Sequence, residues 1–326
     1  MDTLRIYSGN EANQRVRDLA QRRAQGVFGA GEAVSIGIDY FDQTNAPLMR
    51  GEVMILTGLT SHGKTLFAST LARHTLDRLG NAGKRGLLIV MTEETIEARR
   101  IQMWGDARVT IRSVLLGNTS LDLIDAHIAA SLDEPVYFVG QITALEDVGT
   151  TQGIIRPSTV GHSIATLQRM GIEPELVIID HAHDLEPDRP YRDEASRFEA
   201  VADELKQLAN ALNNCCPLVV LAQCNKDVEK RPPIDGQPNA YDLKYMQSLA
   251  ARSKDIFTAY YPLRQRGNGL KFPTVRGEVR AAKGLFLIHA AKERHGQSAG
   301  DTLAMTALDD NGAWSNRLVE AQVGGY

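Results

Sequence analysis

The segment VMILTGLTSHGKTLFAST, which begins at residue 53, constrains the fold more than any other part of the sequence. It carries Gly58, Gly63, Lys64 and Thr65 at the spacing G-x-x-x-x-G-K-[ST], directly after an apolar run and directly before a helical pattern. Glycines at this spacing let backbone N–H groups close around phosphates at the N-terminus of a helix. The sequence therefore predicts a phosphate-binding loop between a strand and a helix. The alternative is a chance match in an unrelated glycine-rich turn.

The side chains of this loop predict ATP, bound with Mg²⁺, as its ligand. Lys64 is expected near the β- and γ-phosphates, where it acts as a point charge, and Thr65 is expected to ligate the metal. His62 is expected to offer its backbone rather than its ring. The complete set of predicted nucleotide-binding residues is Gly58, Ser61, His62, Gly63, Lys64, Thr65 and Leu66.

Apolar runs alternate with helical patterns along the chain, which predicts an α/β fold with a mostly parallel sheet covered on both faces. The predicted strands are 53–57, 87–91, 136–139, 176–179, 218–222, 256–261 and 285–290. The clearest helix is predicted within SRFEAVADELKQLANALNN, where apolar residues fall at helical spacing. Near the C-terminus, a hairpin is predicted with its turn at Asp310, Asn311 and Gly312.

Two predicted strands end in carboxylates that suit nucleotide hydrolysis. Asp180 closes the run ELVIID and is predicted to hold the magnesium water shell, as a Walker B aspartate does. Glu93 and Glu94 follow LLIVMT, and a carboxylate beside the γ-phosphate can align water for attack. These glutamates also suit the first turn of the next helix. Of the two, Glu93 is the predicted catalytic residue.

Two further features of the sequence have more than one interpretation. His181 and His183 follow Asp180, so they are either metal ligands or ordinary histidines, and the lack of an evident third ligand favours the second interpretation. Lys292 and Arg294 stand two residues apart after the apolar run LFLIHA, so they share one face of a strand end. Their position alone suits either solvated charges or a functional pair.

Taken in order, these motifs resemble the RecA-like ATPase domain of DnaB-type replicative helicases. The resemblance runs from about residue 34 to the C-terminus and rests on LTSHGKTLFAS, LLIVMTEE, LVIIDHAHDL, ADELKQLANALNNCCPLVVLAQCNK and KERHG. It implies that Gln223 senses the γ-phosphate. It also implies that Lys292 and Arg294 act on the ATP bound by a neighbouring subunit. The expected assembly is a hexamer that translocates 5′ to 3′ on single-stranded DNA and unwinds forked DNA during replication.

The resemblance also predicts how the chain is divided. Residues 1–33 are expected to form a linker helix that docks on a neighbouring subunit, and residues 34–326 form the ATPase domain. The family's N-terminal primase-binding domain is not expected in this chain, although a helicase loader or primase remains a possible partner. A compact helicase encoded by a plasmid, phage or mobile element and an excised domain both fit, and Met1 favours a natural start.

The predicted contacts with DNA depart in part from the family pattern. The family loop that begins D-L-R-E-S-G corresponds here to DLKYMQS, which keeps a basic residue at Lys244 but has a tyrosine in place of the acid. Lys230 and Arg231, in the loop before it, either touch phosphate or face water. A second basic segment, 264–283, is either a single-strand contact or a solvated face.

The composition narrows the remaining possibilities. A formal charge of −4 argues against attraction of the whole surface to nucleic acid or anionic membrane, so any DNA contact is expected to be local. Cys215, Cys216 and Cys224 lack metal-type spacing and are expected to be reduced thiols. No apolar run reaches the roughly 18 residues of a membrane span, and no signal peptide is evident, so a cytoplasmic protein is expected. A RecA-like or RadA-like filament and a regulatory ATPase switch are the alternative functions.

Overall fold

The computed structural model describes residues 33–80, 84–106, 108–141, 154–212, 215–265, 267–294, 296–308 and 314–321, with a few positions between 13 and 21. Most of the predicted linker segment and the predicted turn at Asp310, Asn311 and Gly312 lie outside the described residues.

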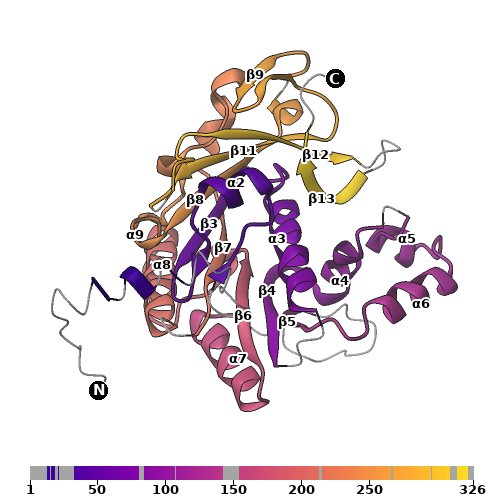
Figure 1. The fold of residues 1–326 in the computed structure, drawn as a ribbon, viewed down its shortest axis with the longest axis vertical. Coiled ribbons are helices and arrows are strands. Elements are labelled where there is room, and N and C mark those ends of the chain that lie inside the picture. Colours follow the sequence, from indigo (N-terminus) through magenta and orange to yellow (C-terminus); the bar gives the residue numbers. More distant parts are fainter. Residues whose placement is uncertain are drawn as a thin grey trace.

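A sheet of nine strands forms the centre of the molecule, as Figure 1 shows. In spatial order its strands are β13 (Trp314–Glu320), β12 (Thr302–Leu308), β11 (Leu285–Lys292), β8 (Asp255–Tyr260), β3 (Val53–Gly58), β7 (Leu218–Gln223), β6 (Glu173–Asp180), β4 (Arg85–Thr95) and β5 (Val136–Gln141). Neighbours from β8 to β5 are parallel, whereas β11, β12 and β13 pair antiparallel. All seven predicted strands are confirmed, and so is the α/β class.

Helices and shorter elements surround this sheet. The helices are α2 (Asp39–Thr44), α3 (Lys64–Leu79), α4 (Ile96–Trp104), α5 (Ile111–Leu115), α6 (Leu121–Ala130), α7 (Pro157–Arg169), α8 (Glu194–Ala211) and α9 (Gln247–Arg252). Short 3₁₀ turns occur at Ala182–Asp184, Lys226–Lys230, Pro233–Asp235, Ala240–Asp242 and Pro262–Gln265. Two small antiparallel pairs complete the fold, β1 (Ala33–Val34) with β2 (Leu48–Met49) and β9 (Lys271–Thr274) with β10 (Gly277–Arg280).

The sheet is buried on both faces because successive side chains of its strands point in opposite directions. In β3, Met54 and Leu56 share an apolar cluster with Phe67 of α3. The intervening Ile55 belongs to the cluster on the other face, which contains Leu205 of α8. The continuous apolar runs in the sequence follow from this two-sided burial.

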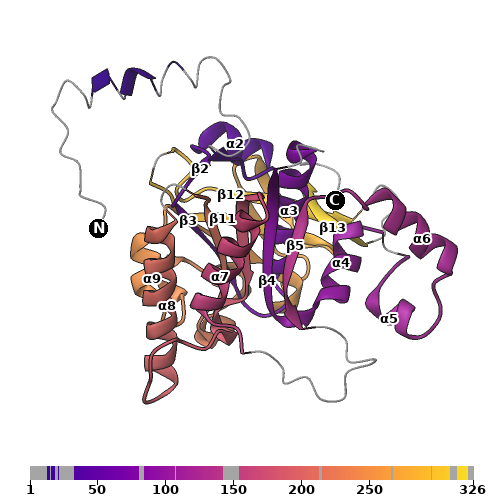
Figure 2. The same ribbon diagram turned by 90° about the horizontal axis from the view of Figure 1, so that it is seen from below.

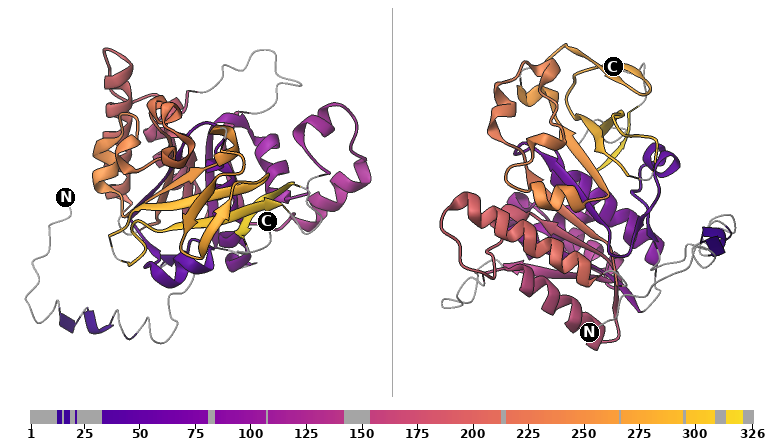
Figure 3. Two further views of the ribbon diagram at one scale, coloured as in Figure 1. Left: turned by 90° about the horizontal axis from the view of Figure 1, so that it is seen from above. Right: turned by 90° about the vertical axis from the view of Figure 1, so that its left-hand side faces the viewer.

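The figures show how the layers are arranged. The antiparallel strands β11, β12 and β13 lie at one end of the molecule and α7 at the other, in Figure 1 and in the right-hand view of Figure 3. Helices α5 and α6 project from the side opposite α8 and α9, as Figure 2 also shows. Among the described helices, none is long and apolar enough to cross a membrane.

Candidate functional site

Four neighbouring parallel strands deliver the predicted nucleotide-site residues to one edge of the sheet. Gly58 ends β3, Gln223 ends β7 and Asp180 ends β6, while Glu93 lies near the end of β4. The register pairs Gly58 with Gln223 and Met91 with Asp180. Because parallel strands end at a common edge, where α/β sheets bind ligands, residues far apart in the sequence meet here.

The phosphate-binding loop depends on its glycines. Gly63 has a φ of +94° and directly precedes α3, and Ser61 also has a positive φ, of 62°. A Cβ atom at Gly58, whose φ is +155°, would lie 2.5 Å from the carbonyl oxygen of Ala259 in β8. At Gly63 it would lie 2.7 Å from the ring of Phe286. Only glycine therefore fits these two positions without displacing its neighbours.

Lys64 extends into the loop that precedes it. Its Nζ donates hydrogen bonds to the carbonyl oxygens of Gly58 and Leu59, both at 2.9 Å. Burial lowers the pKa of Lys64, and the negative potential of Cys224, Asp180 and Glu93 opposes that effect. The ammonium group is thus held inside the turn that a phosphate would enter.

The ring of His62 belongs to the scaffold of the loop. Its Nδ1 accepts a hydrogen bond of 3.1 Å from the backbone N–H of Tyr261. The ring also stacks on Tyr260, with the ring centroids 5.6 Å apart. Burial lowers the pKa of His62 to about 4, so the ring is neutral at pH 7. This neutral acceptor fastens the loop to the end of β8.

A cavity of about 410 Å³ opens beside the loop. One side of its lining is Ser61, Gly63, Lys64, Thr65 and Leu66, and the other includes Tyr261, Phe286, Trp314 and Arg264. The phosphate-binding loop and apolar ring faces therefore border one cavity, which can accept a ligand with a charged end and a flat apolar end.

Asp180 pairs with an arginine that the sequence analysis did not single out. Arg99 of α4 is completely buried, and its Nη2 lies 3.0 Å from Oδ2 of Asp180. Its Nη1 donates to Oε1 of Gln102 at 3.3 Å. The helical spacing of Arg99 with the partly buried Ile96 and the buried Met103 is a signal that places the arginine on the buried face.

Thr65 and Asp180 provide the oxygen donors that Mg²⁺ prefers. A hydroxyl and a carboxylate at the edge of the phosphate-binding loop suit a hard cation that keeps part of its water shell. The hydrogen bond from Arg99 goes to Oδ2 of Asp180. These residues therefore fit the metal that accompanies a nucleotide.

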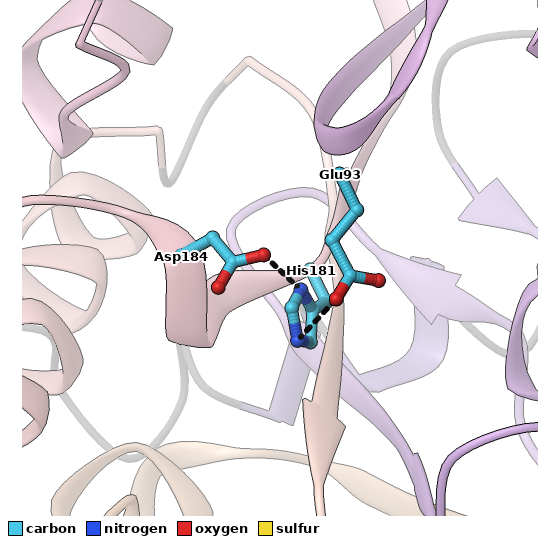
Figure 4. Close-up of side chains that lie close together, drawn as sticks. All are labelled: Glu93, His181 and Asp184. Atoms are coloured by element: carbon cyan, nitrogen blue, oxygen red, sulfur yellow. Dashed lines mark ion pairs between the residues drawn. The ribbon is translucent and has the colours of Figure 1, made fainter.

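His181 lies between Glu93 and Asp184, as Figure 4 shows. Its Nε2 is 3.7 Å from Oε1 of Glu93, and its Nδ1 is 3.2 Å from Oδ2 of Asp184. The amide nitrogen of Gln223 lies 2.7 Å from the same Nε2. Because the carboxylates meet different ring nitrogens, the arrangement suits a ring that positions its neighbours better than one ion held by all three groups.

The two candidate glutamates lie in different surroundings. Glu93 contacts His181, whereas Glu94 lines the cavity and accepts a hydrogen bond of 2.9 Å from Gln102. Thr92 connects the end of β4 to β6, because its hydroxyl accepts a hydrogen bond of 3.0 Å from the backbone N–H of His181. That bond holds the start of the glutamate pair next to the end of β6.

Lys292 and Arg294 lie at the opposite edge of the sheet. Strand β11 is antiparallel to β8, and Lys292 pairs with Ile256 near the start of β8, far from the phosphate-binding loop. The Nζ of Lys292 donates to the carbonyl oxygens of Ala250 and Ser253 at 2.6 and 3.0 Å. Arg294 donates to the carbonyl oxygen of Ala251. Both cations therefore bind the last carbonyl groups of α9, as cations at helix C-termini do.

The predicted DNA-binding cations each have a carboxylate partner. Lys230 lies 2.6 Å from Asp227, and Lys244 lies 3.2 Å from Glu194. Arg231 forms two hydrogen bonds to Asp242, one of them of 2.9 Å. These pairs set the positions of the cations in the free chain. The pair of Lys230 and Asp227 is well exposed to solvent.

Comparison with known proteins identifies the family of this fold. The family model for the DnaB-like helicase C-terminal domain matches residues 33–306. A solved ATPase domain of another protein aligns at 16% identity and a TM-score of 0.71, covering 98% of this chain and all of that one. A DnaB-like replicative helicase, whose structure was solved with attention to its interactions with primase, aligns at 15% identity and a TM-score of 0.70, covering 98% of this chain and 68% of that one. No curated protein matches the sequence. The predicted RecA-like fold is confirmed.

The buried pair predicts a large loss of stability when Arg99 is replaced by methionine. Asp180, with a side chain only 12% exposed, would lose its buried partner. Breaking a buried ion pair from one side costs about 3–5 kcal/mol of unfolding free energy. Urea denaturation measures the loss. Arg108→Met, which removes an exposed partner of Asp106, is the control and should change stability little. Equal effects of the two substitutions would contradict the buried role.

The neutral ring of His62 predicts a loss of stability in acid. Its folded-state pKa of about 4 lies below the ordinary value of 6.5. Protonation therefore favours the unfolded chain, and the contribution of His62 is complete above pH 6.5 and declines as the pH falls towards 4. Between pH 7.5 and 5.5 the wild type should lose about 1 kcal/mol more than His62→Gln. Urea denaturation at both pH values measures the difference, and parallel pH profiles would refute it.

Proposed function

The chain belongs to the DnaB-like helicase C-terminal domain family, and from this premise we propose that it is an ATP-dependent DNA helicase that works as a hexameric ring. In this proposal it moves 5′ to 3′ on single-stranded DNA and unwinds forked duplexes during replication. The family membership supports nucleotide hydrolysis, and the polarity and the ring are carried over from the family.

The observation that carries the proposal is the separation of the two halves of the site. The phosphate-binding loop follows the end of β3. Lys292 and Arg294 lie at the end of β11, which runs antiparallel to β8 and therefore to β3. Neither cation can reach a nucleotide bound at Lys64 of the same chain. If both act in hydrolysis, they act on a nucleotide held by a neighbouring subunit, and a closed ring gives every subunit such a neighbour.

Within one subunit, the residues at the carboxyl edge have distinct tasks in this proposal. The N–H groups between Gly58 and Thr65 and the ammonium group of Lys64 bind the phosphates. Thr65 and Asp180 hold Mg²⁺, which neutralises phosphate charge when bound. Glu93 orients the attacking water and accepts its proton, and Gln223 contacts the γ-phosphate.

Charge that develops on the γ-phosphate is met from the next subunit. A guanidinium group delivered to this position accelerates hydrolysis by roughly 10³ to 10⁵ in other P-loop enzymes. Arg294 has this role in our proposal, with Lys292 beside it. In the free chain both cations donate to carbonyl groups at the end of α9, so a neighbour's nucleotide would have to compete for these donors or use those that remain.

We assign the DNA contact to the segment that follows β7, with Lys230, Arg231 and Lys244 as its cations. Binding of phosphate must displace or supplement their present carboxylate partners. A helicase loader or a primase is a further proposed partner, and the predicted linker at residues 1–33 remains a prediction.

Unwinding of a forked duplex with free 5′ and 3′ tails tests the function directly. With ATP, we expect strand separation that requires the 5′ tail, and with a non-hydrolysable analogue we expect none. Gel separation of the strands measures the result. ATP turnover that responds to DNA without any separation would favour a filament, and turnover indifferent to DNA would favour a regulatory switch.

Mixed oligomers test the shared site. Arg294→Ala should bind nucleotide normally yet lose most turnover, and Lys64→Ala should lose nucleotide binding. Mixed in one ring, the Lys64→Ala subunit can supply its Arg294 to nucleotide held by the other variant, so partial turnover should return. Steady-state ATP hydrolysis at several mixing ratios measures the rescue, and its absence at every ratio, with mixed rings confirmed by mass, would count against the shared site.

A further inference from the structure

A short antiparallel pairing joins the end of β7 to residues 239–246, called the 239–246 segment below. Cys224 pairs with Leu243 in an isolated bridge. On one side of this bridge, Asn225 donates its N–H to the carbonyl oxygen of Asp242 at 2.7 Å. On the other side, Lys244 donates its N–H to the carbonyl oxygen of Gln223 at 3.3 Å.

The ring of His183 replaces one hydrogen bond of this pairing. Residues that face each other as Gln223 and Lys244 do normally exchange two backbone hydrogen bonds. Here the N–H of Gln223 donates to Nδ1 of His183 at 3.2 Å, and Nε2 of the same ring lies 3.0 Å from the carbonyl oxygen of Lys244. A single tautomer, with its proton on Nε2, satisfies both contacts.

Packing holds this ring in place. His183 is 4% exposed, and its ring meets Phe198 of α8 edge to face, with the ring centroids 4.8 Å apart. Phe198 in turn stacks on Tyr245 at 5.8 Å, and the ammonium group of Lys244 lies 5.0 Å from the Phe198 centroid. Tyr245 has a φ of 53°, which is unusual for an aromatic residue. The 239–246 segment is therefore held against His183 on several sides.

We propose that His183 is a positioning residue that couples the nucleotide site to the 239–246 segment, which takes single-stranded nucleic acid. This inference rests on the proposed function. The side chain of Gln223 meets His181, which meets Glu93, while the backbone of the same Gln223 is joined through His183 to Lys244. A displacement of Gln223 must move Lys244 or leave partly buried N–H and C=O groups unpaired, which is unfavourable.

Coupling has a measurable definition. If the 239–246 segment binds DNA differently when nucleotide is bound, the ratio of the DNA dissociation constants without and with nucleotide departs from one. A histidine that served packing alone would affect thermal stability without affecting this ratio. The ratio therefore separates coupling from a purely structural role.

His183→Phe and His183→Gln are the test variants. Phenylalanine keeps the packing and removes both hydrogen bonds, whereas glutamine offers one donor and one acceptor in place of the ring nitrogens. Fluorescence anisotropy of a labelled dT oligonucleotide, with and without a non-hydrolysable ATP analogue and Mg²⁺, gives the ratio. We expect the ratio of His183→Phe to differ from that of the wild type by at least fivefold, in the direction of one. We expect His183→Gln to give a ratio between those of His183→Phe and the wild type.

His289→Phe is the matched control. It removes a half-buried histidine of β11 whose Nδ1 lies 3.1 Å from the hydroxyl of Thr302, and β8 and β3 lie between β11 and β7 in the sheet. Its ratio should equal that of the wild type. If His183→Phe does not fold, Tyr245→Gly gives a second test, because it frees the backbone next to Lys244 and should bring the ratio closer to one while leaving the ring of His183 intact.

Two results would overturn the inference. One is that His183→Phe has the same ratio as the wild type or, where that variant does not fold, that Tyr245→Gly does. The other is that the wild-type protein itself gives a ratio of one, since no coupling would then exist for His183 to carry. Strand separation by that same wild-type protein would leave the proposed function standing, and failure to bind the oligonucleotide at all would count against the function itself.

Discussion

The register of the parallel strands is the constraint on which the rest of the structure depends. β3, β7, β6 and β4 are packed on both faces, so a shift by one residue would exchange side chains between the two apolar clusters. It would also move the end of the strand by about 3.3 Å, while catalysis is sensitive to errors of about 1 Å. The packing of the core and the placement of Gly58, Gln223, Asp180 and Glu93 are thus one physical requirement.

The reversal of direction between β8 and β11 has the opposite consequence. It carries the end of β11 to the edge where the parallel strands begin. Lys292 and Arg294 therefore cannot contact the phosphate-binding loop of their own chain. In the free chain, the carbonyl groups at the end of α9 satisfy these cations, and burial lowers the pKa of Lys292. Strand direction therefore places the candidate hydrolytic residues in two sets at opposite ends of the strands, one beside the phosphate-binding loop and one beside α9.

The sequence was informative wherever a function follows from local order. A strand, a glycine-rich turn and a helix in succession were enough to predict the loop at Gly58–Thr65, and an apolar run ending in an acid was enough to predict that Asp180 lies at the end of a strand. Contacts that join distant segments were not predictable in this way. Arg99 meets Asp180 across 81 positions of sequence, and nothing in the run EARRIQM names that partner.

The histidines show the same limit more sharply. The spacing of His181 and His183 left metal ligands and ordinary residues as alternatives, and it did not predict which groups the two rings contact. The ring of His181 lies between the carboxylate of Asp184 and the side chain of Gln223, and the ring of His183 is inserted into a backbone pairing. The role of His183 depends on the loop after β7 folding back beside its own strand, an event that periodicity does not report.

The segment after β7 also connects the two edges of the sheet. It begins at Gln223, passes the bridge at Leu243 and continues into α9, whose last carbonyl groups bind Lys292 and Arg294. In the proposed ring, one end of this segment therefore contacts the subunit's own nucleotide site, and the other end holds the cations that serve the neighbour's site. Because α9 holds both cations through its carbonyl groups, a movement of α9 in that ring would move Lys292 and Arg294 with it. In that ring, one stretch of backbone would therefore link the proposed γ-phosphate contact at Gln223 to the cations that meet the neighbour's nucleotide.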